Sequence, residues 1–189
     1  MHNIFNTELS YIKDNRIKNS LITILNKLPD YFYEIETSST GKYHPAFSSG
    51  KQGLIRHTKA AIRIAVELMN NEALQNFNQN EKDLIIFSLM IHDGLKCGKI
   101  KSQYTAFDHP ILIANLVKEN ESELELTKEE VEFVCKCVKT HMGPWTTDYR
   151  GNEVLEAPKD KYQRFVHMCD YLSSRKFLDI KFENNEIVD

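Results

Sequence analysis

The chain has 189 residues, 41% of them hydrophobic and 27% charged, a composition typical of one globular domain with a sizeable core and unlike that of a fibre, a disordered segment or a repeat array. Its apolar runs, such as residues 84–87, are far shorter than the roughly 18 to 20 residues that span a bilayer. The net charge of −3 indicates no strong nucleic-acid-binding surface, and the first residues lack the basic and apolar regions of a secretion signal, so we expect a cytoplasmic protein without a membrane partner.

Six segments carry apolar side chains at the three- and four-residue spacings of a helix. We predict helices over residues 7–28, 54–70, 80–97, 109–119, 127–142 and 158–177. Long loops rich in polar residues, Gly or Pro are expected over residues 37–53, 98–107 and 143–157. No segment alternates with period two for long enough to predict a strand. The sequence therefore predicts an all-α, single-domain helical bundle over residues 1–189.

Local signals predict where several of these helices begin. Asn80 is expected to cap the third helix, Thr127 and Glu130 form a capping box before the fifth, and Pro158 opens the last one. The third helix is apolar almost all round, which predicts a central position. The four cysteines form no CxxC pair, and we expect them to be buried, reduced thiols.

Five of the predicted helices carry a histidine or a carboxylate in register with their apolar stripes. These residues are His57, His92, Asp93, His109, His141 and Asp170. A single histidine on an apolar face is most simply a hydrogen-bonded core residue. Six such groups in one bundle are costly to bury unless they are paired or ligated. Because imidazole and carboxylate suit divalent cations, and helical bundles assemble metal sites from facing helices, the pattern predicts a metal site.

The same residues carry a resemblance to a known family. The motifs are GLIRHT at residues 53–58, His92-Asp93 followed by Lys96 in an HD-x-x-K pattern, DHP at residues 108–110 and DYLSSR at residues 170–175. Over residues 44–176 the chain resembles the HD-domain metal-dependent phosphohydrolase superfamily. The resemblance implies a helical bundle of the HD type, with the helix predicted over residues 7–28 packed on it.

The resemblance also implies the metal ligands. One divalent ion would be held by His57, His92, Asp93 and Asp170, and a second by His109 and His141, with Asp93 as a bridge between them. Neither the number of ions, one or two, nor their identity among Mn, Fe, Mg, Co, Ni and Zn follows from the sequence.

One position departs from the family pattern. Two-metal members often have a second histidine where this chain has Met142, and a thioether is a poor ligand for hard cations. We therefore expect the ion beside His109 and His141 to bind more weakly. His44, in the loop before the first motif, is either a compensating ligand or an ordinary surface residue.

The implied reaction is hydrolysis of a phosphoester or phosphodiester bond by a metal-activated water. Asp93 is expected to orient the attacking water. Lys96 is expected to contact the substrate phosphate as a point charge, unless it is only a solvated residue at a helix end. Arg175 is a weaker candidate for phosphate contact, and His167 is expected to be a core or ligand-supporting residue.

The long loops are expected to ring the pocket and to determine the substrate. Their aromatic side chains either stack a nucleobase or only pin the loops: Tyr43, Phe47, Tyr104, Phe107, Trp145 and Tyr149. The expected partner is a nucleotide, a cyclic nucleotide or a short oligonucleotide. Two other functions stay open, a di-iron oxygenase on the same scaffold and a regulatory module that binds nucleotides without turnover. The oligomeric state does not follow from the sequence.

Overall fold

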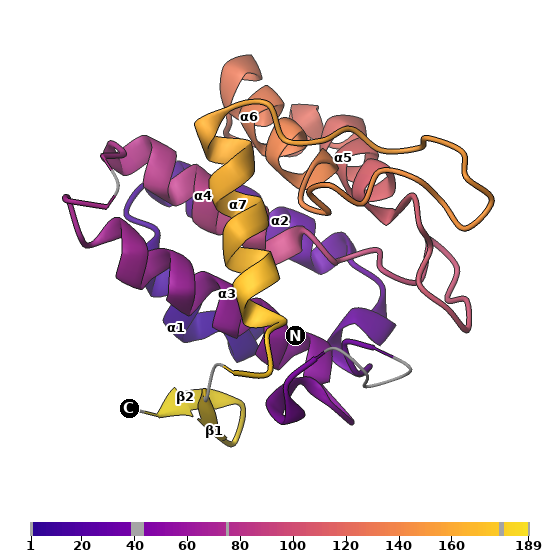
Figure 1. The fold of residues 1–189 in the computed structure, drawn as a ribbon. Coiled ribbons are helices and arrows are strands. Elements are labelled where there is room, and N and C mark those ends of the chain that lie inside the picture. Colours follow the sequence, from indigo (N-terminus) through magenta and orange to yellow (C-terminus); the bar gives the residue numbers. More distant parts are fainter. Residues whose placement is uncertain (1, 39–43, 75, 178–179, 189) are drawn as a thin grey trace.

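The computed structural model describes residues 2–38, 44–74, 76–177 and 180–188 (Figure 1). Within them the α-helices are α1 (Asn6–Tyr11), α2 (Asn15–Lys27), α3 (Gly53–Met69), α4 (Gln79–Ile91), α5 (His109–Glu119), α6 (Lys128–Lys139) and α7 (Lys161–Ser173). Short 3-10 helices lie at His2–Phe5, Asp30–Tyr33, Ala46–Ser48 and Glu121–Glu123. The strands β1 (Lys181–Glu183) and β2 (Glu186–Val188) form a small antiparallel hairpin. The fold of the described residues is all-α, as predicted, apart from this hairpin.

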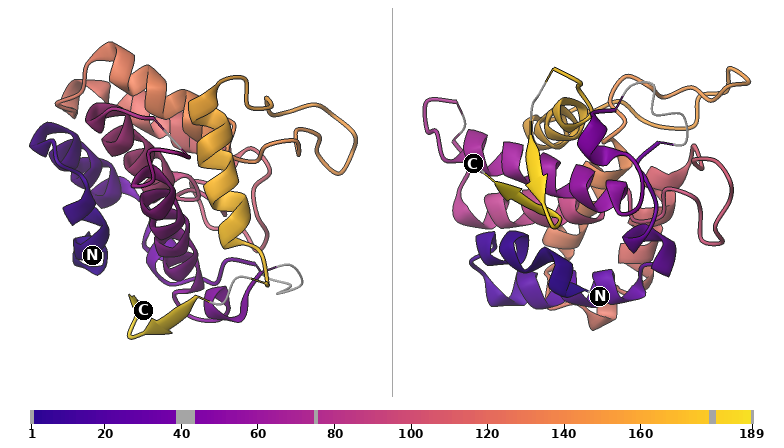
Figure 2. Two further views of the ribbon diagram at one scale, coloured as in Figure 1. Left: turned by 60° about the vertical axis from the view of Figure 1, so that its left-hand side comes forward. Right: turned by 90° about the horizontal axis from the view of Figure 1, so that it is seen from below.

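Helix α4 is the centre of the core. Every residue from Asp83 to Ile91 is buried, and α4 packs against α2, α3, α6 and α7. Helices α5 and α6 form a closely packed pair, and α7 lies along α3. Figure 2 shows α3 between the N-terminal helices and α7. The central position that the apolar sequence of α4 predicts is therefore the one observed.

Close packing at the start of α3 requires a glycine. A Cβ atom at Gly53 would lie 2.0 Å from the carbonyl oxygen of Ser48, in the 3-10 helix that precedes α3. This contact holds the end of the segment before α3 against the helix that carries His57. At the start of α6, Thr127 and Glu130 form the predicted capping box.

The prediction of one continuous helix over residues 7–28 is wrong, because residues 12–14 are not helical and separate α1 from α2. The carboxylate of Asp83 accepts hydrogen bonds from the backbone amides of Lys13 and Asp14, at 3.0 and 2.8 Å. Asp14 then caps α2 through a bond from the amide of Arg16. The amides at the break are thus satisfied by a side chain that lies far away in the sequence.

Several other boundaries differ from prediction. Helix α6 ends at Lys139 and α7 at Ser173, so the predicted extensions to residues 142 and 177 are wrong. Asn78, not Asn80, caps α4, and the helix ends at Ile91, so the predicted extension to residue 97 is wrong. Asp160, not Pro158, caps α7 by accepting from two backbone amides. The hairpin was not predicted; its turn residues Asn184 and Asn185 both have positive φ, as a tight hairpin turn requires.

None of the helices in the described ranges is both long and apolar enough to cross a membrane. All four cysteines are free and buried, as expected.

Candidate metal centre

The six predicted ligand residues come together from five segments of the chain. His57 lies on α3, His92 caps the C-terminal end of α4 and Asp93 follows it, His109 begins α5, His141 lies just beyond α6, and Asp170 lies on α7. A cavity of about 630 Å³ is lined by all of them except His92, which is fully buried behind it.

The first cluster contains His57, His92 and Asp170. The Nε2 atom of His57 lies 3.0 Å from Oδ1 of Asp170 and 3.4 Å from Nε2 of His92. The distance from Nε2 of His92 to the same Asp170 oxygen is 3.4 Å. These three groups could hold a metal ion.

The second cluster contains Asp93, His109 and His141. Oδ1 of Asp93 lies 3.0 Å from Nε2 of His109 and 3.7 Å from Nε2 of His141, and the two imidazole nitrogens are 3.1 Å apart. These three groups could also hold a metal ion.

Asp93 connects the two clusters through its two carboxylate oxygens. While Oδ1 faces the second cluster, Oδ2 lies 3.8 Å from Nε2 of His57 and 3.6 Å from Nε2 of His92. A single carboxylate thus faces both sets of imidazoles.

Backbone carbonyls orient three of the imidazoles. His92, His109 and His141 each place Nδ1 2.7 Å from the carbonyl oxygen of the residue three positions earlier. A carbonyl can only accept, so Nδ1 carries the proton and Nε2 presents a lone pair in the neutral ring. Histidine ligands in metalloproteins are held by the same kind of bond.

Ser173 orients the fourth imidazole. Its hydroxyl donates to the carbonyl oxygen of Asp170 at 2.7 Å and lies 3.0 Å from Nδ1 of His57. Because the hydroxyl proton is already used, Nδ1 of His57 is the donor and its Nε2 atom also faces the cluster as an acceptor. The sequence reasoning missed Ser173, although its position three residues after Asp170 places it on the same face of α7.

In the resulting arrangement, atoms that can only accept hydrogen bonds face one another. Four imidazole Nε2 atoms and the carboxylates of Asp93 and Asp170 converge, and all of these residues except Asp170 are almost fully buried. Facing lone pairs need a positive charge between them, either a proton or a metal ion. The nitrogen and oxygen donors suit divalent Mn, Fe, Co, Ni or Zn. The residues present therefore fit one or two such ions.

The pKa values show how the cluster is balanced when protons supply the charge. Burial disfavours the imidazolium, but the carboxylates of Asp93 and Asp170 outweigh it and raise the pKa of His92 to about 9. Burial also opposes ionisation of Asp93, yet Lys96 and the surrounding imidazoles hold its pKa well below the usual range. Burial lowers the pKa of His57 and of His109. The imidazolium of His92 thus stands beside the ionised carboxylates of Asp93 and Asp170, whose pKa values both lie well below the usual range.

Lys96 lies in the turn beyond α4, not on the helix as expected. Its ammonium is 2.5 Å from Oδ2 of Asp93, and its side chain is 13% exposed at the cavity wall. Lys96 is therefore not a freely solvated residue at a helix end. Arg175 also lines the cavity, with its guanidinium bonded to the hydroxyl of Ser174.

His44 and Met142 lie beside different clusters. The ring of His44 is 5.8 Å from that of His57, and among the described residues its buried Nδ1 atom has no hydrogen-bond partner. Burial lowers the pKa of His44 to about 4, and the charge of the neighbouring His57 is the second-largest cause. Met142 follows His141 directly and lines the cavity. His44 thus lies beside the first cluster, whereas the residue it was expected to compensate for lies beside the second.

The expectation that three loops ring the pocket is met, since each contributes lining residues: Thr37, Ser38 and His44 from the first, Thr105 from the second and Trp145 from the third. Of the aromatic candidates, Trp145 alone lines the cavity, and Tyr43 lies outside the described residues. Phe47 packs on Phe182 instead. Tyr171 of α7 also lines the cavity. The sequence analysis missed it, because its place on the apolar stripe of the last predicted helix indicated a core residue.

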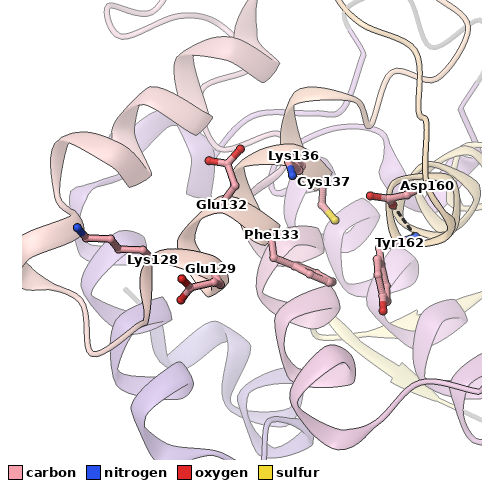
Figure 3. A pocket seen from close by; sticks show the side chains of 8 residues that line it. All are labelled: Lys128, Glu129, Glu132, Phe133, Lys136, Cys137, Asp160 and Tyr162. Carbon is pink, nitrogen blue, oxygen red and sulfur yellow. Dashed lines mark hydrogen bonds between the residues drawn. The ribbon is translucent and has the colours of Figure 1, made fainter.

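A second hollow of about 460 Å³ lies on the surface of α6 and the start of α7 (Figure 3). Figure 3 shows its lining side chains, among them Lys128, Glu129, Glu132 and Phe133 of α6, with Asp160 and Tyr162 at the start of α7. None of its lining residues belongs to either His/Asp cluster. The His/Asp clusters lie instead at the larger cavity of about 630 Å³.

The chain matches no protein-family model, no curated protein and no solved structure. The resemblance to the HD superfamily therefore rests on the motif residues, and the His/Asp clusters are compatible with it.

Proposed function

We propose that the chain is a metal-dependent phosphohydrolase of the HD-domain type. The observation that carries this proposal is the position of Asp93, whose two oxygens face two separate pairs of inward-pointing imidazoles. Such a carboxylate suits two neighbouring cations, the arrangement that phosphate-ester hydrolysis commonly uses.

Divalent cations, when bound, supply a water of lowered pKa and polarise a phosphoryl oxygen. The ligands for them would be His57, His92 and Asp170 on one side and His109 and His141 on the other, with Asp93 shared. The protein groups determine orientation. Asp93, almost fully buried and facing both sets of imidazoles, is the candidate for orienting the attacking water.

The charge of the cavity favours an anionic substrate. Its two carboxylates, Asp93 and Asp170, are balanced by the positive charges of Lys96 and Arg175. A bound divalent cation would add two positive charges and give the cavity a net positive charge. A phosphate group matches this charge, and Lys96 and Arg175 lie on the cavity wall where they can contact its oxygens.

The proposal is tested by elemental analysis of the purified protein, followed by a hydrolysis panel. The panel contains nucleotides, cyclic nucleotides and short oligonucleotides, each assayed with Mn, Mg, Fe, Co and Ni. We expect release of phosphate or cleavage of a phosphodiester with at least one ion. Tightly bound iron with oxygen-dependent turnover would instead favour an oxygenase, and nucleotide binding without turnover would favour a regulatory module.

Lys96→Ala separates substrate contact from metal binding. The Lys96 ammonium contacts Oδ2 of Asp93, the oxygen that faces His57 and His92. Removing the lysine leaves this oxygen free, so the variant should not lose metal. Turnover should fall because a positive charge toward the phosphate is lost. Lys99→Ala is the matched control, since Lys99 is half exposed and paired with Glu119 on the surface. Equal turnover in both variants would mean that Lys96 only pairs with Asp93 and does not contact the substrate phosphate.

A further inference from the structure

One wall of the cavity is built from two aromatic rings and a guanidinium. Trp145 and Tyr171 are stacked with ring centroids 5.9 Å apart and an interplanar angle of 20°. The guanidinium carbon of Arg175 lies 4.2 Å from the centre of the Tyr171 ring. All three side chains line the cavity that contains the His/Asp clusters. We refer to Trp145, Tyr171 and Arg175 as the aromatic wall.

The aromatic wall is fixed relative to the candidate metal ligands. Tyr171 directly follows Asp170 on α7. Trp145 packs edge-on against His167, whose Nδ1 atom lies 2.7 Å from the carbonyl oxygen of His141. Gly143 has φ +66°, and a Cβ atom there would lie 2.2 Å from the ring of His167. The glycine thus permits the contact that ties the loop of Trp145 to the second cluster.

Exposure distinguishes the aromatic wall from rings that only pin a loop. Trp145 is 51% exposed and Tyr171 is 37% exposed, although both face a cavity whose deeper residues are almost fully buried. A ring that only anchors a loop buries its faces in the core. An exposed indole and an adjacent guanidinium instead offer a flat surface that suits a second planar group.

We propose that the aromatic wall is a stacking subsite that selects phosphoesters carrying a nucleobase, with the base against Trp145 and the phosphate at the His/Asp clusters. This inference rests on the proposed phosphohydrolase function and adds its substrate class. Stacking accepts any base, because every base has a π face, so we expect weak discrimination among bases and strong discrimination against phosphoesters without one.

The chain supplies its own reporter, because Trp145 is the only tryptophan. Indole fluorescence, excited where tyrosine does not absorb, therefore reports on the aromatic wall alone. Metal-loaded protein is mixed rapidly with adenosine 5′-monophosphate or with ribose 5-phosphate, and emission is recorded before turnover. We expect quenching by the nucleotide and none by the sugar phosphate. Equal emission with both ligands, at concentrations where the nucleotide is hydrolysed, would overturn the proposal.

Kinetics of variants give the second measurement. Trp145→Ala should raise KM for a hydrolysed nucleotide roughly tenfold, within the range that removal of a base-stacking aromatic costs, and should leave kcat nearly unchanged. Trp145→Phe should recover most of the loss because it keeps a planar ring. Tyr149→Ala is the matched control, since Tyr149 belongs to the same loop, is 87% exposed and does not line the cavity.

The outcomes separate the subsite from the catalytic function. Quenching without hydrolysis would support the subsite and overturn the phosphohydrolase. Hydrolysis with unchanged KM in Trp145→Ala and no quenching would overturn the subsite and leave the phosphohydrolase standing. Absence of both quenching and hydrolysis would overturn both.

Discussion

Two buried groups of charged side chains lie on nearly opposite sides of α3, and they are built in different ways. His57 belongs to the first His/Asp cluster, whereas Lys59, two residues later, is fully buried against the N- and C-terminal segments. The Lys59 ammonium lies 3.0 Å from a carboxylate oxygen of Glu8 and 2.9 Å from one of Glu186. At Lys59 an ammonium donor contacts two carboxylate acceptors. Around His57, by contrast, imidazole nitrogens that can accept hydrogen bonds face carboxylate oxygens that also accept. Burial of polar groups therefore does not by itself mark a functional site; what marks the cluster around His57 is that its nitrogen and oxygen acceptors face one another, so that a proton or a metal ion has to lie between them.

The largest effect is expected from Asp93→Ala, which removes the carboxylate that faces both clusters. Metal content and hydrolysis should be lost together. The fall in metal affinity should exceed the roughly 10- to 100-fold that loss of even an outer hydrogen-bond partner of a ligand costs. Elemental analysis after dialysis and initial rates with the best substrate measure the two losses.

Asp83→Ala is the control for this variant, because Asp83 is equally buried but satisfied by backbone amides. It should lower the free energy of unfolding by about 1–3 kcal/mol, because the backbone amides of Lys13 and Asp14 lose the charged acceptor that satisfies them. Metal content of the folded protein should not change. Full metal retention by Asp93→Ala would contradict the shared-ligand assignment.

The second prediction concerns the paired group. Lys59→Met leaves Glu8, which is 4% exposed, without its buried cation and should lower the free energy of unfolding by about 3–5 kcal/mol. Metal content of the folded fraction should stay at the wild-type value. Denaturant unfolding and elemental analysis test the two statements, and Lys59→Met with Glu8→Gln should recover part of the stability. A loss of metal in folded Lys59→Met would remove the contrast between the two groups.

The destabilisation of Lys59→Met should depend on pH in a definite direction. Burial already raises the pKa of Glu8 in the wild-type protein, and loss of the Lys59 charge raises it further. A raised carboxyl pKa contributes stability that is present below the ordinary value and is lost as the pH rises through the raised value. The variant should therefore differ least from the wild-type protein at acidic pH and most at neutral pH, which unfolding curves across this range measure.

Much of the site was predictable because its signals are local. The helical spacing around His57 and Asp170, the His92-Asp93 pair and the capping box at Thr127 each occupy a few neighbouring residues. Apolar periodicity shows which side of a helix faces inward, so polar residues on that side had to come together in the core. The interpretation of Lys96 as a helical residue failed because α4 ends at Ile91.

The features that escaped prediction depend on contacts between distant residues. The break between α1 and α2 is stabilised by Asp83, about 70 positions further along the chain. Lys59 is an ordinary helical lysine in the sequence, and only the docking of Glu8 and Glu186 from the two ends of the chain makes its burial possible. Such pairings leave no periodic pattern in the sequence.

Ser173→Ala tests the tautomer assignment and should have a smaller effect. Without the hydroxyl that accepts from Nδ1 of His57, the ring loses its fixed orientation, and affinity at the first cluster should fall 10- to 100-fold. The second cluster, which Ser173 does not contact, should keep its affinity. Ser88→Ala is the matched control, since that buried hydroxyl donates to the carbonyl of Leu84 and its residue belongs to neither cluster. Titration with a divalent cation separates the two clusters if their affinities differ.

The smallest effect is expected from Met142→His. The first cluster has His57, His92, Asp170 and one oxygen of Asp93, whereas the second has only His109, His141 and the other Asp93 oxygen. Titration of the wild-type protein with Mn²⁺ should therefore show two unequal steps. A histidine at position 142, next to His141 on the cavity wall, adds a nitrogen donor and should strengthen the weaker step roughly tenfold, by analogy with the gain from one supporting group. Two equally tight ions in the wild-type protein would show that the second cluster is already complete. A single ion, unaffected by Met142→His, would instead mean that His109 and His141 face the substrate phosphate.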